Sequence, residues 1–294
     1  ILSGDIDTDF ELPGPLPLRW LRFYNSLDTR AGTGHGQGWG GELFVQLNTA
    51  ADGRITFMDE QGRPVEWEPL EPGYAQENIA EGYVLHRSED GQFAVQSGDG
   101  LYRLFEPVVP LPIGQVPADP CTYRLARIED ENGNYIALRY RGGFEIQNIT
   151  DSTGRLLELT YAHAAGGGAQ PMPRIAQIAI SVPAPGETPG LLVRYEYSAQ
   201  GQLAAVINAD GTTTRTFAYN DAGLMSQHRT PSGLSSHYEW EQFDDHPRVT
   251  RQWNDAGQDY RFEYRKVANS QPESGLTAGG TRVTDHLGRH YEWR

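Results

Sequence analysis

The sequence predicts an all-β protein built from antiparallel β-hairpins, and two observations lead to this fold class. Glycines recur at short intervals inside polar turns, and segments of about six to eight residues rich in Val, Ile, Thr, Tyr and Phe lie between them. Gly and Pro are also frequent, with 34 Gly and 19 Pro among 294 residues, which favours a protein with many turns. We see no amphipathic helical pattern.

The turn pattern is most regular over residues 191–240, where glycines fall at Gly201, Gly211, Gly223 and Gly233. One hairpin there is a unit of roughly 22 residues, a period that indicates an internal repeat. The Asp or Asn before each glycine can bond the backbone of its own turn, and glycine supplies the positive φ. Further turns of this kind are Asp130–Gly133, Asp151–Gly154, Asp285–Gly288 and the Asn-Asp-Ala-Gly turn that ends at Gly257.

Aromatic residues follow the turn glycines at a nearly constant distance. The aromatic stands seven residues after the glycine at Tyr140, Tyr161, Trp240 and Tyr264, and eight after it at Tyr219. Tyr197 belongs to the same set through the i, i+2 spacing of strand aromatics, which places side chains on one face. Because a lone hairpin is only marginally stable, we predict that these aromatics and turns are structural repeat positions that join neighbouring hairpins.

Differences in residue composition and pattern along the chain predict three parts. Residues 1–110 form a β domain before the repeats, with strands over residues 19–24 and, after a glycine-dense loop, 42–47. Five prolines occur between Pro107 and Pro120, and we interpret residues 111–122 as a Pro-rich connection. Residues 123–294 form the hairpin array, and Pro- and Gly-rich stretches that interrupt it are expected to be loops.

Charge and composition exclude several classes of partner. The net charge of −15 argues against nucleic acid and anionic membranes, because both attract clustered positive charge. No segment is apolar enough to span a bilayer, and no signal peptide is visible. Cys121 is the single cysteine, which excludes a disulfide framework and a thiolate metal cluster. Because the chain lacks an initiator Met, we expect it to be a segment of a longer protein.

Two stretches of the sequence resemble Rhs (rearrangement hot spot) proteins. The repeat, an aromatic followed by Gly-x-Leu, Asp-x-x-Gly and a later Tyr, is similar to the YD repeat of that family. The start of the chain, from Gly4 to Arg19, and the later motifs Gly38-Trp39 and 57–64 resemble the domain that precedes YD repeats in bacterial polymorphic toxins. The resemblance spans essentially the whole chain.

The resemblance implies a curved, spiralling sheet that forms part of a hollow β-cocoon around a C-terminal toxin. This chain has too few repeats to close a shell, and it lacks the Asp-Pro-x-Gly self-cleavage region and any toxin domain. By resemblance it is the N-terminal part of the shell of a type VI secretion effector, cytoplasmic before export and then secreted. Its implied partners are the toxin domain as cargo and secretion spike or chaperone proteins.

Residues that could carry chemistry are few, and we predict no catalytic residues, metal site or cofactor. His35 could be a base on a flexible loop, but a turn residue beside a packing Trp39 is favoured. Asp5, Asp7 and Asp9 alternate as in a calcium loop without its glycine, so a polar strand face is favoured. Asp244-Asp245-His246 is favoured as a solvated loop, and Cys121 has no adjacent base. The alternative function is a carbohydrate-binding surface module that uses strand or loop aromatics.

Overall fold

The computed structural model describes residues 7–30, 32–112, 115, 117–163, 173–243, 246–264 and 280–293. These residues form 24 β-strands and one short 3₁₀ helix, with antiparallel pairing in every recorded strand pair. The predicted all-β fold of antiparallel hairpins is therefore confirmed. Within the described ranges, no helix has the length and apolar character required to cross a bilayer.

The chain divides into two compact units, residues 1–212 and 213–294. The predicted division around residues 111–122 stays a prediction. The first unit contains β1 (Asp7–Leu12), β2 (Leu18–Tyr24), β3 (Trp39–Gly40), β4 (Gln46–Thr49), β5 (Ile55–Met58), β6 (Pro64–Trp67), β7 (Ala75–Asn78), β8 (Tyr83–Arg87), β9 (Phe93–Ser97), β10 (Tyr102–Pro107), β11 (Cys121–Glu129), β12 (Tyr135–Gly142), β13 (Glu145–Asp151), β14 (Leu156–His163), β15 (Pro173–Val182), β16 (Gly190–Tyr197) and β17 (Leu203–Asn208).

The main sheet of the first unit runs from β7 to β17, each strand beside the next one in the chain. At β11 the sheet branches. One edge of β11 pairs with β10, and the other is shared by β12, at residues 127–129, and β4, at residues 121–124. Strands β5 and β6 extend the β4 branch. The N-terminal region is thus joined to the hairpin array through one long strand.

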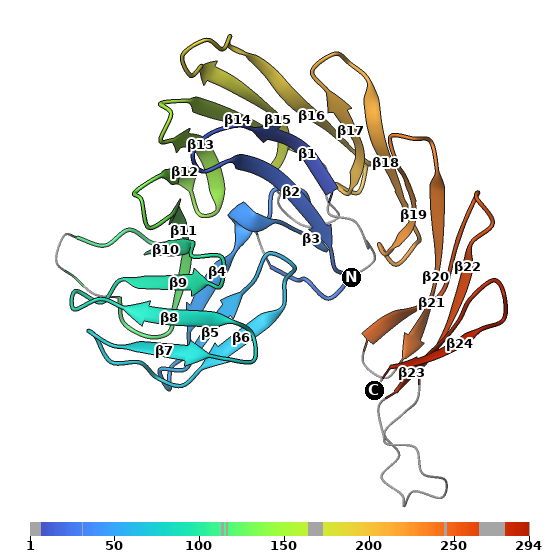
Figure 1. Cartoon of the computed structure of the whole chain (residues 1–294), viewed down its shortest axis with the longest axis horizontal. Coiled ribbons are helices and arrows are strands. Elements are labelled where there is room, and N and C mark those ends of the chain that lie inside the picture. The colour runs from blue at the N-terminus through green and yellow to red at the C-terminus, as the bar shows by residue number, and fades with distance from the viewer. Residues whose placement is uncertain are drawn as a thin grey trace, which may run out of the picture. The chain divides into compact units, whose positions relative to one another are not determined.

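A second, three-stranded sheet, β1–β2–β3, lies against the main sheet of the first unit. In Figure 1 its blue strands β1 and β2 cross in front of the green and yellow strands. Contacts between β1 and β16 fix it there, and Leu18, Trp20 and Trp39 are almost fully buried beneath it. Residues 183–189, between β15 and β16, have no regular secondary structure, and this agrees with the loop expected over 183–190 except that Gly190 already belongs to β16.

One predicted strand is wrong. Residues 42–47 were expected to form a strand, but Glu42–Phe44 is a 3₁₀ helix and β4 begins only at Gln46. The reason is that Leu43 and Phe44 are both buried. The tight turn, closed by the Phe44 N–H donating to the Gly41 carbonyl at 3.0 Å, directs both side chains inward.

The second unit is a single run of antiparallel strands in chain order. It contains β18 (Thr213–Tyr219), β19 (Met225–Arg229), β20 (Ser235–Phe243), β21 (His246–Asn254), β22 (Asp259–Tyr264), β23 (Thr281–Thr284) and β24 (His290–Trp293). Phe217, Met225, Tyr238 and Val249 are its most buried large side chains. Most other positions are half-buried, so this unit gains less from apolar burial than the first.

Candidate functional site

The predicted repeat aromatics lie at irregularities in the strand pairing. Tyr161 of β14 pairs with Ile175 at a β-bulge, where the register skips one residue of β15. Its hydroxyl donates a hydrogen bond at 3.0 Å to the carbonyl of Ile146 in the preceding strand, β13. Ile146 itself pairs with Tyr140 at another bulge. A bulge interrupts the ladder of backbone hydrogen bonds, so the tyrosine supplies a donor where the ladder is broken.

The same contact recurs along the array, and we call it the aromatic-to-bulge bond. Its acceptor is the carbonyl of an apolar residue that itself pairs, at a bulge, with an aromatic residue of an earlier strand. The bonds are Tyr140 Oη to Leu125 O at 2.5 Å, Tyr197 Oη to Ile175 O at 2.7 Å, Trp240 Nε1 to Met225 O at 2.7 Å and Tyr264 Oη to Val249 O at 2.7 Å.

Donor and acceptor are 15 residues apart in every case except one. Tyr197 and Ile175 are 22 apart, because the loop between β15 and β16 is longer. Tyr219 lies opposite Met225 at a bulge of the same kind. The position requires a hydrogen-bond donor on an aromatic ring, and this explains why Trp240 can replace tyrosine: its indole offers an N–H.

Burial keeps these phenols protonated. It raises the pKa of Tyr140, Tyr161 and Tyr264 above the ordinary value for tyrosine. The positive charge of Arg124, which lies over the Tyr140 ring at 4.0 Å, lowers the pKa of Tyr140, but burial outweighs this effect. The hydroxyls are therefore neutral donors at any physiological pH, and their polar ends are occupied by backbone carbonyls.

The predicted turn residues share one geometry. In the turn at 130–134 the Gly133 N–H donates to the Asp130 carbonyl, and the Asp130 N–H donates to the carbonyl of Asn134. The Asp130 carboxylate accepts from the N–H groups of Asn132 and Asn134 at 2.9 Å each. This is a tight turn closed by a glycine with positive φ. The same backbone bonds occur at 50–54, 59–63, 88–92, 97–101, 151–155, 198–202, 208–212, 220–224, 230–234, 254–258 and 285–289, with glycines that include Gly154, Gly211, Gly223, Gly233, Gly257 and Gly288.

Some of these turns carry an arginine directly after the glycine, a signal that sequence reasoning missed. Arg155 bonds to Asp151 and reaches Glu187 and the Pro13 carbonyl, although its side chain is only 1% exposed. It therefore ties a turn of the array to loop 183–189 and to the link between β1 and β2. Arg289 makes the corresponding bond to Asp285 at 2.6 Å, but at a solvent-exposed position.

A buried ion pair inside the N-terminal sheet is joined to the array by the hydroxyl of Tyr195. Arg22 of β2 forms two hydrogen bonds of 2.7 Å with the carboxylate of Asp9 in β1, and both side chains are at most 1% exposed. Tyr195 of β16 donates to the same carboxylate at 2.7 Å. The expected polar strand face at Asp9 is therefore wrong, because a carboxylate with three donors is satisfied in the interior. Asp5 lies outside the described residues.

His35 lies in a bend of the glycine-dense loop, and its ring is completely enclosed. Its ring contacts Trp20, Phe44 and Tyr195. Trp20 Nε1 donates to His35 Nε2 at 3.4 Å, so His35 Nδ1 carries the proton and donates to the Tyr197 hydroxyl at 3.2 Å. Burial, with smaller contributions from Arg22 and Arg174, lowers the pKa of His35 well below its ordinary value. The histidine is a neutral link in a buried network, out of reach of a substrate.

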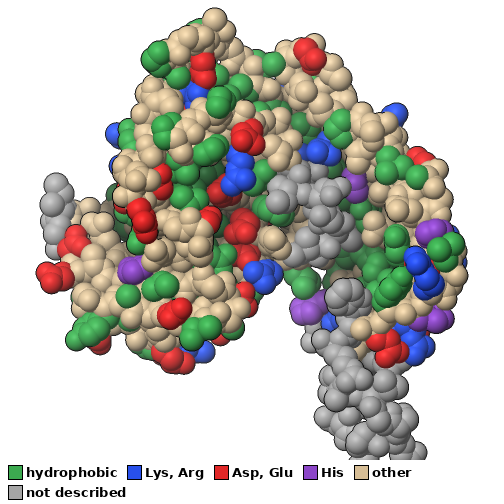
Figure 2. All heavy atoms as spheres, viewed as in Figure 1, with side chains coloured by type: hydrophobic (Ala, Val, Ile, Leu, Met, Phe, Trp, Pro, Cys, Tyr) green, Lys and Arg blue, Asp and Glu red, His purple; other side chains and the backbone are tan. Residues whose placement is uncertain are grey.

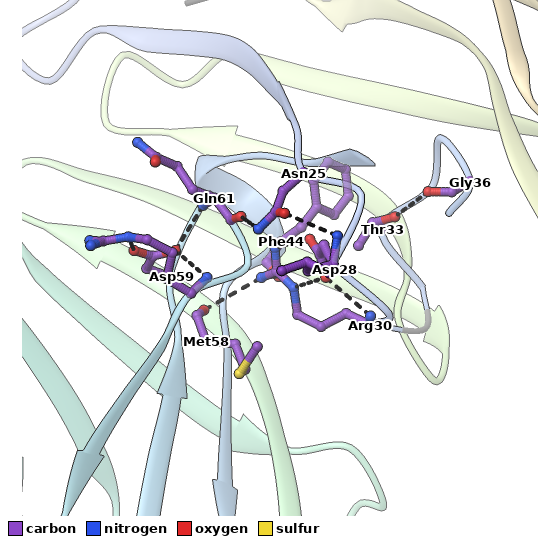
Figure 3. A network of polar contacts seen from close by, with 11 residues as sticks. Asn25, Asp28, Arg30, Thr33, Gly36, Phe44, Met58, Asp59 and Gln61 are labelled. Atoms are coloured by element: carbon purple, nitrogen blue, oxygen red, sulfur yellow. Dashed lines mark hydrogen bonds and ion pairs between the residues drawn. The ribbon is translucent and has the colours of Figure 1, made fainter. Parts of the chain in front are cut away.

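The loop that carries His35 is fixed at its other end by polar contacts (Figure 3). Arg30 forms an ion pair with Asp28 at 2.6 Å and donates to the carbonyls of Phe44 and Met58. Asn25 donates to the carbonyl of Gln61, in the turn between β5 and β6. The segment that leads into the glycine-dense loop is therefore tied by polar contacts to the 3₁₀ helix and to the β4 branch.

The remaining candidate residues come together in no site within the described ranges. Cys121 starts β11, and burial raises the pKa of its thiol. His246 is exposed at the start of β21, and Asp244 and Asp245 lie outside the described residues. The described residues contain no group of three or more His, Cys, Asp or Glu side chains arranged for a metal ion. Figure 2 shows charges of both signs scattered over the visible face.

Comparisons with known proteins identify two regions. Residues 5–67 match a family described as a domain of unknown function (DUF6531), and residues 197–236 match the RHS Repeat. The second match contains Tyr197, a donor of an aromatic-to-bulge bond, and Tyr219, which lies at a bulge opposite Met225.

Two toxins are similar over nearly the whole chain. The chain is 31% identical to double-stranded DNA deaminase toxin A of Burkholderia cenocepacia over 297 residues, which cover 100% of this chain and 18% of the toxin. It is 27% identical to toxin protein Tse5 of Pseudomonas aeruginosa over 308 residues, which cover 96% of this chain and 22% of that protein. The chain thus spans about a fifth of the length of these relatives.

Among solved structures, TcdB2-TccC3 and its complex with Cdc42 each align with 84% of this chain and 16% of their own, at 13% identity and a TM-score of 0.32. The RHS repeat and the whole-length similarity to two toxin proteins carry the assignment. The chain belongs to the Rhs/YD-repeat family of toxin-associated proteins.

Proposed function

We propose that this chain is a non-catalytic wall segment of an Rhs-type shell that encloses and carries a toxin domain. The toxin is supplied by another part of a longer polypeptide, and the shell is secreted by one bacterium against another, with type VI secretion as the route. Two observations outside the fold support this role: the toxins it resembles are about five times its length, and the similarity covers this chain almost completely.

The observation that carries the proposal is the aromatic-to-bulge bond. A hairpin in isolation is marginally stable, and an array gains stability from the interface between neighbours. Each bond joins a strand to the preceding one across the turn between them, at the bulge where that preceding strand pairs with the strand before it, for example Tyr161 to Ile146. The repeat aromatics therefore hold neighbouring strands together in a continuous wall. The turn residues Asp130, Gly133 and their equivalents determine where the chain reverses between strands.

The proposed absence of catalysis has its own support. His35, the best candidate for a catalytic base, has both ring nitrogens engaged and no exposed surface. The carbohydrate-binding alternative requires aromatic groups that converge on an accessible site. Here the hydroxyls of Tyr140 and Tyr161 are directed to backbone carbonyls at separate positions along the sheet.

Limited proteolysis of the complete polypeptide tests the enclosure. We expect the region after the repeats to resist a protease in the wild type and to be digested rapidly when Tyr140→Ala and Tyr161→Ala loosen the wall. An exposed tyrosine, Tyr74→Ala, serves as the matched control. Equal digestion of the downstream region in all three proteins would contradict enclosure. A glycan array is the complementary measurement: specific sugar binding that is abolished by substitution of one loop aromatic would support the alternative.

A further inference from the structure

Two strand edges of the first unit border a single cavity. β6 pairs with β5 and β7 pairs with β8, and the pairing within the described residues gives neither strand a partner on its other edge. Residues of both strands, including Glu66, Trp67, Gln76 and Asn78, line a cavity of about 370 Å³. Both strands belong to the cyan part of Figure 1. Free strand edges offer unpaired N–H and C=O groups to another chain.

The cavity has an acidic rim. Glu66 and Glu68 stand at i, i+2 positions and are exposed on the same face, and Glu77 of β7 borders the same space. None of these three carboxylates forms an ion pair with a described residue. Arg54, the one cation at the cavity, is already paired with Asp52 at 2.8 Å. The site therefore carries uncompensated negative charge at the spacing of alternate strand residues.

Two further features favour an occupant. Trp67 lines the cavity and is 4% exposed, and its buried indole Nε1–H has no acceptor among the described residues. Ile79 and Tyr74 flank β7 and are 84% and 67% exposed, which makes them two of the most exposed large apolar residues in the described chain. Apolar groups beside a free strand edge are typical of surfaces that accept another chain.

We propose that this cavity is the docking site of an extended basic peptide, which adds as a β-strand to the free edges of β6 and β7. Strand addition supplies affinity through backbone hydrogen bonds and specificity through alternate side chains. Lys or Arg at every second position of the peptide then faces Glu66, Glu68 and Glu77, while the intervening residues are apolar. A second copy of this chain fits less well, because its net charge is −15. The inference does not depend on the proposed shell function.

Binding of a fluorescein-labelled, eight-residue peptide of alternating Lys and Val to the whole chain tests the site by fluorescence anisotropy. We expect the triple variant Glu66→Gln, Glu68→Gln, Glu77→Gln to bind roughly tenfold more weakly, because three partly exposed ion pairs are removed. The control variant Glu131→Gln, Glu158→Gln, Glu196→Gln removes the same charge from exposed positions elsewhere and should bind like the wild type.

A peptide of alternating Lys and Pro distinguishes strand addition from attraction by charge alone. It carries the same charge but lacks alternate N–H donors, so we expect it not to bind. Hydrogen exchange with the Lys-Val peptide should slow at residues 64–67 and 75–78. Equal binding of the two peptides, equal binding by the two triple variants, or protection at other residues would overturn the proposal. So would self-association of the chain that the Lys-Val peptide reverses, because the occupant would then be a second copy.

Discussion

The aromatic-to-bulge bond of Tyr161 makes a quantitative prediction. Tyr161→Phe preserves the ring and removes only the hydroxyl that donates to the carbonyl of Ile146, a residue with no exposed surface. A buried acceptor that loses its partner destabilises a protein by about 1–3 kcal/mol. The carbonyl lies beside a bulge and keeps its second lone pair, so we expect the free energy of unfolding to fall by about 1–2 kcal/mol.

Urea unfolding followed by circular dichroism measures this change. In thermal unfolding of a unit of residues 1–212, the same loss of unfolding free energy corresponds to a decrease in Tm of about 2–8 °C. Tyr135→Phe is the matched control, because Tyr135 is also a strand tyrosine, and its hydroxyl has no hydrogen bond to a described residue. We expect the control to change stability by less than about 0.5 kcal/mol. If Tyr161→Phe is as stable as this control, the aromatic-to-bulge bond does not stabilise the array.

Two further predictions concern the N-terminal region. Burial lowers the pKa of His35 below its unfolded value of 6.5, so the unfolded chain takes up a proton there before the folded protein does. The contribution of this residue to the free energy of unfolding is therefore complete above pH 6.5 and is lost as the pH falls below it. At pH 5.5 the wild type should lose about 1.4 kcal/mol that His35→Gln does not lose. Urea titrations at pH 7.5 and 5.5 check this, with exposed His286→Gln behaving as wild type. Gly62→Ala and Gly82→Ala both place a side chain at positive φ, 74° and 70°, but only the Cβ at 62 would come within 2.5 Å of Asp28. Thermal unfolding should show Gly62→Ala less stable than Gly82→Ala by about 1–3 kcal/mol, and equal values would contradict the packing argument.

The sequence predicts the hairpin array well because its signals are local. A turn such as 130–134 is specified by Asp130 and Gly133 within five residues, and the spacing from Gly154 to Tyr161 lies inside one hairpin. These patterns predict the strands, the turns and the face on which the aromatics lie. They do not predict which carbonyl accepts each aromatic-to-bulge bond, because Ile146 looks like any other apolar strand residue in the sequence.

The N-terminal sheet could not be predicted in the same way. Its position depends on contacts between residues far apart in the chain, such as Tyr195 with Asp9, which are separated by 186 residues. Whether a carboxylate is solvated or buried is decided by partners of this kind, so the alternation of Asp5, Asp7 and Asp9 was uninformative. The burial of His35 could not be predicted for the same reason, because the rings that enclose it come from β2, β16 and the 3₁₀ helix.

The direction of the aromatic-to-bulge bonds has a consequence for biosynthesis. In every bond the carbonyl acceptor precedes the aromatic donor in the chain, from Leu125 and Tyr140 to Val249 and Tyr264. A ribosome therefore releases each acceptor before the residue that will bond to it. For this bond, every new strand meets a preceding strand that has already emerged, and none has to wait for a later one. The array can grow in the order in which it is translated.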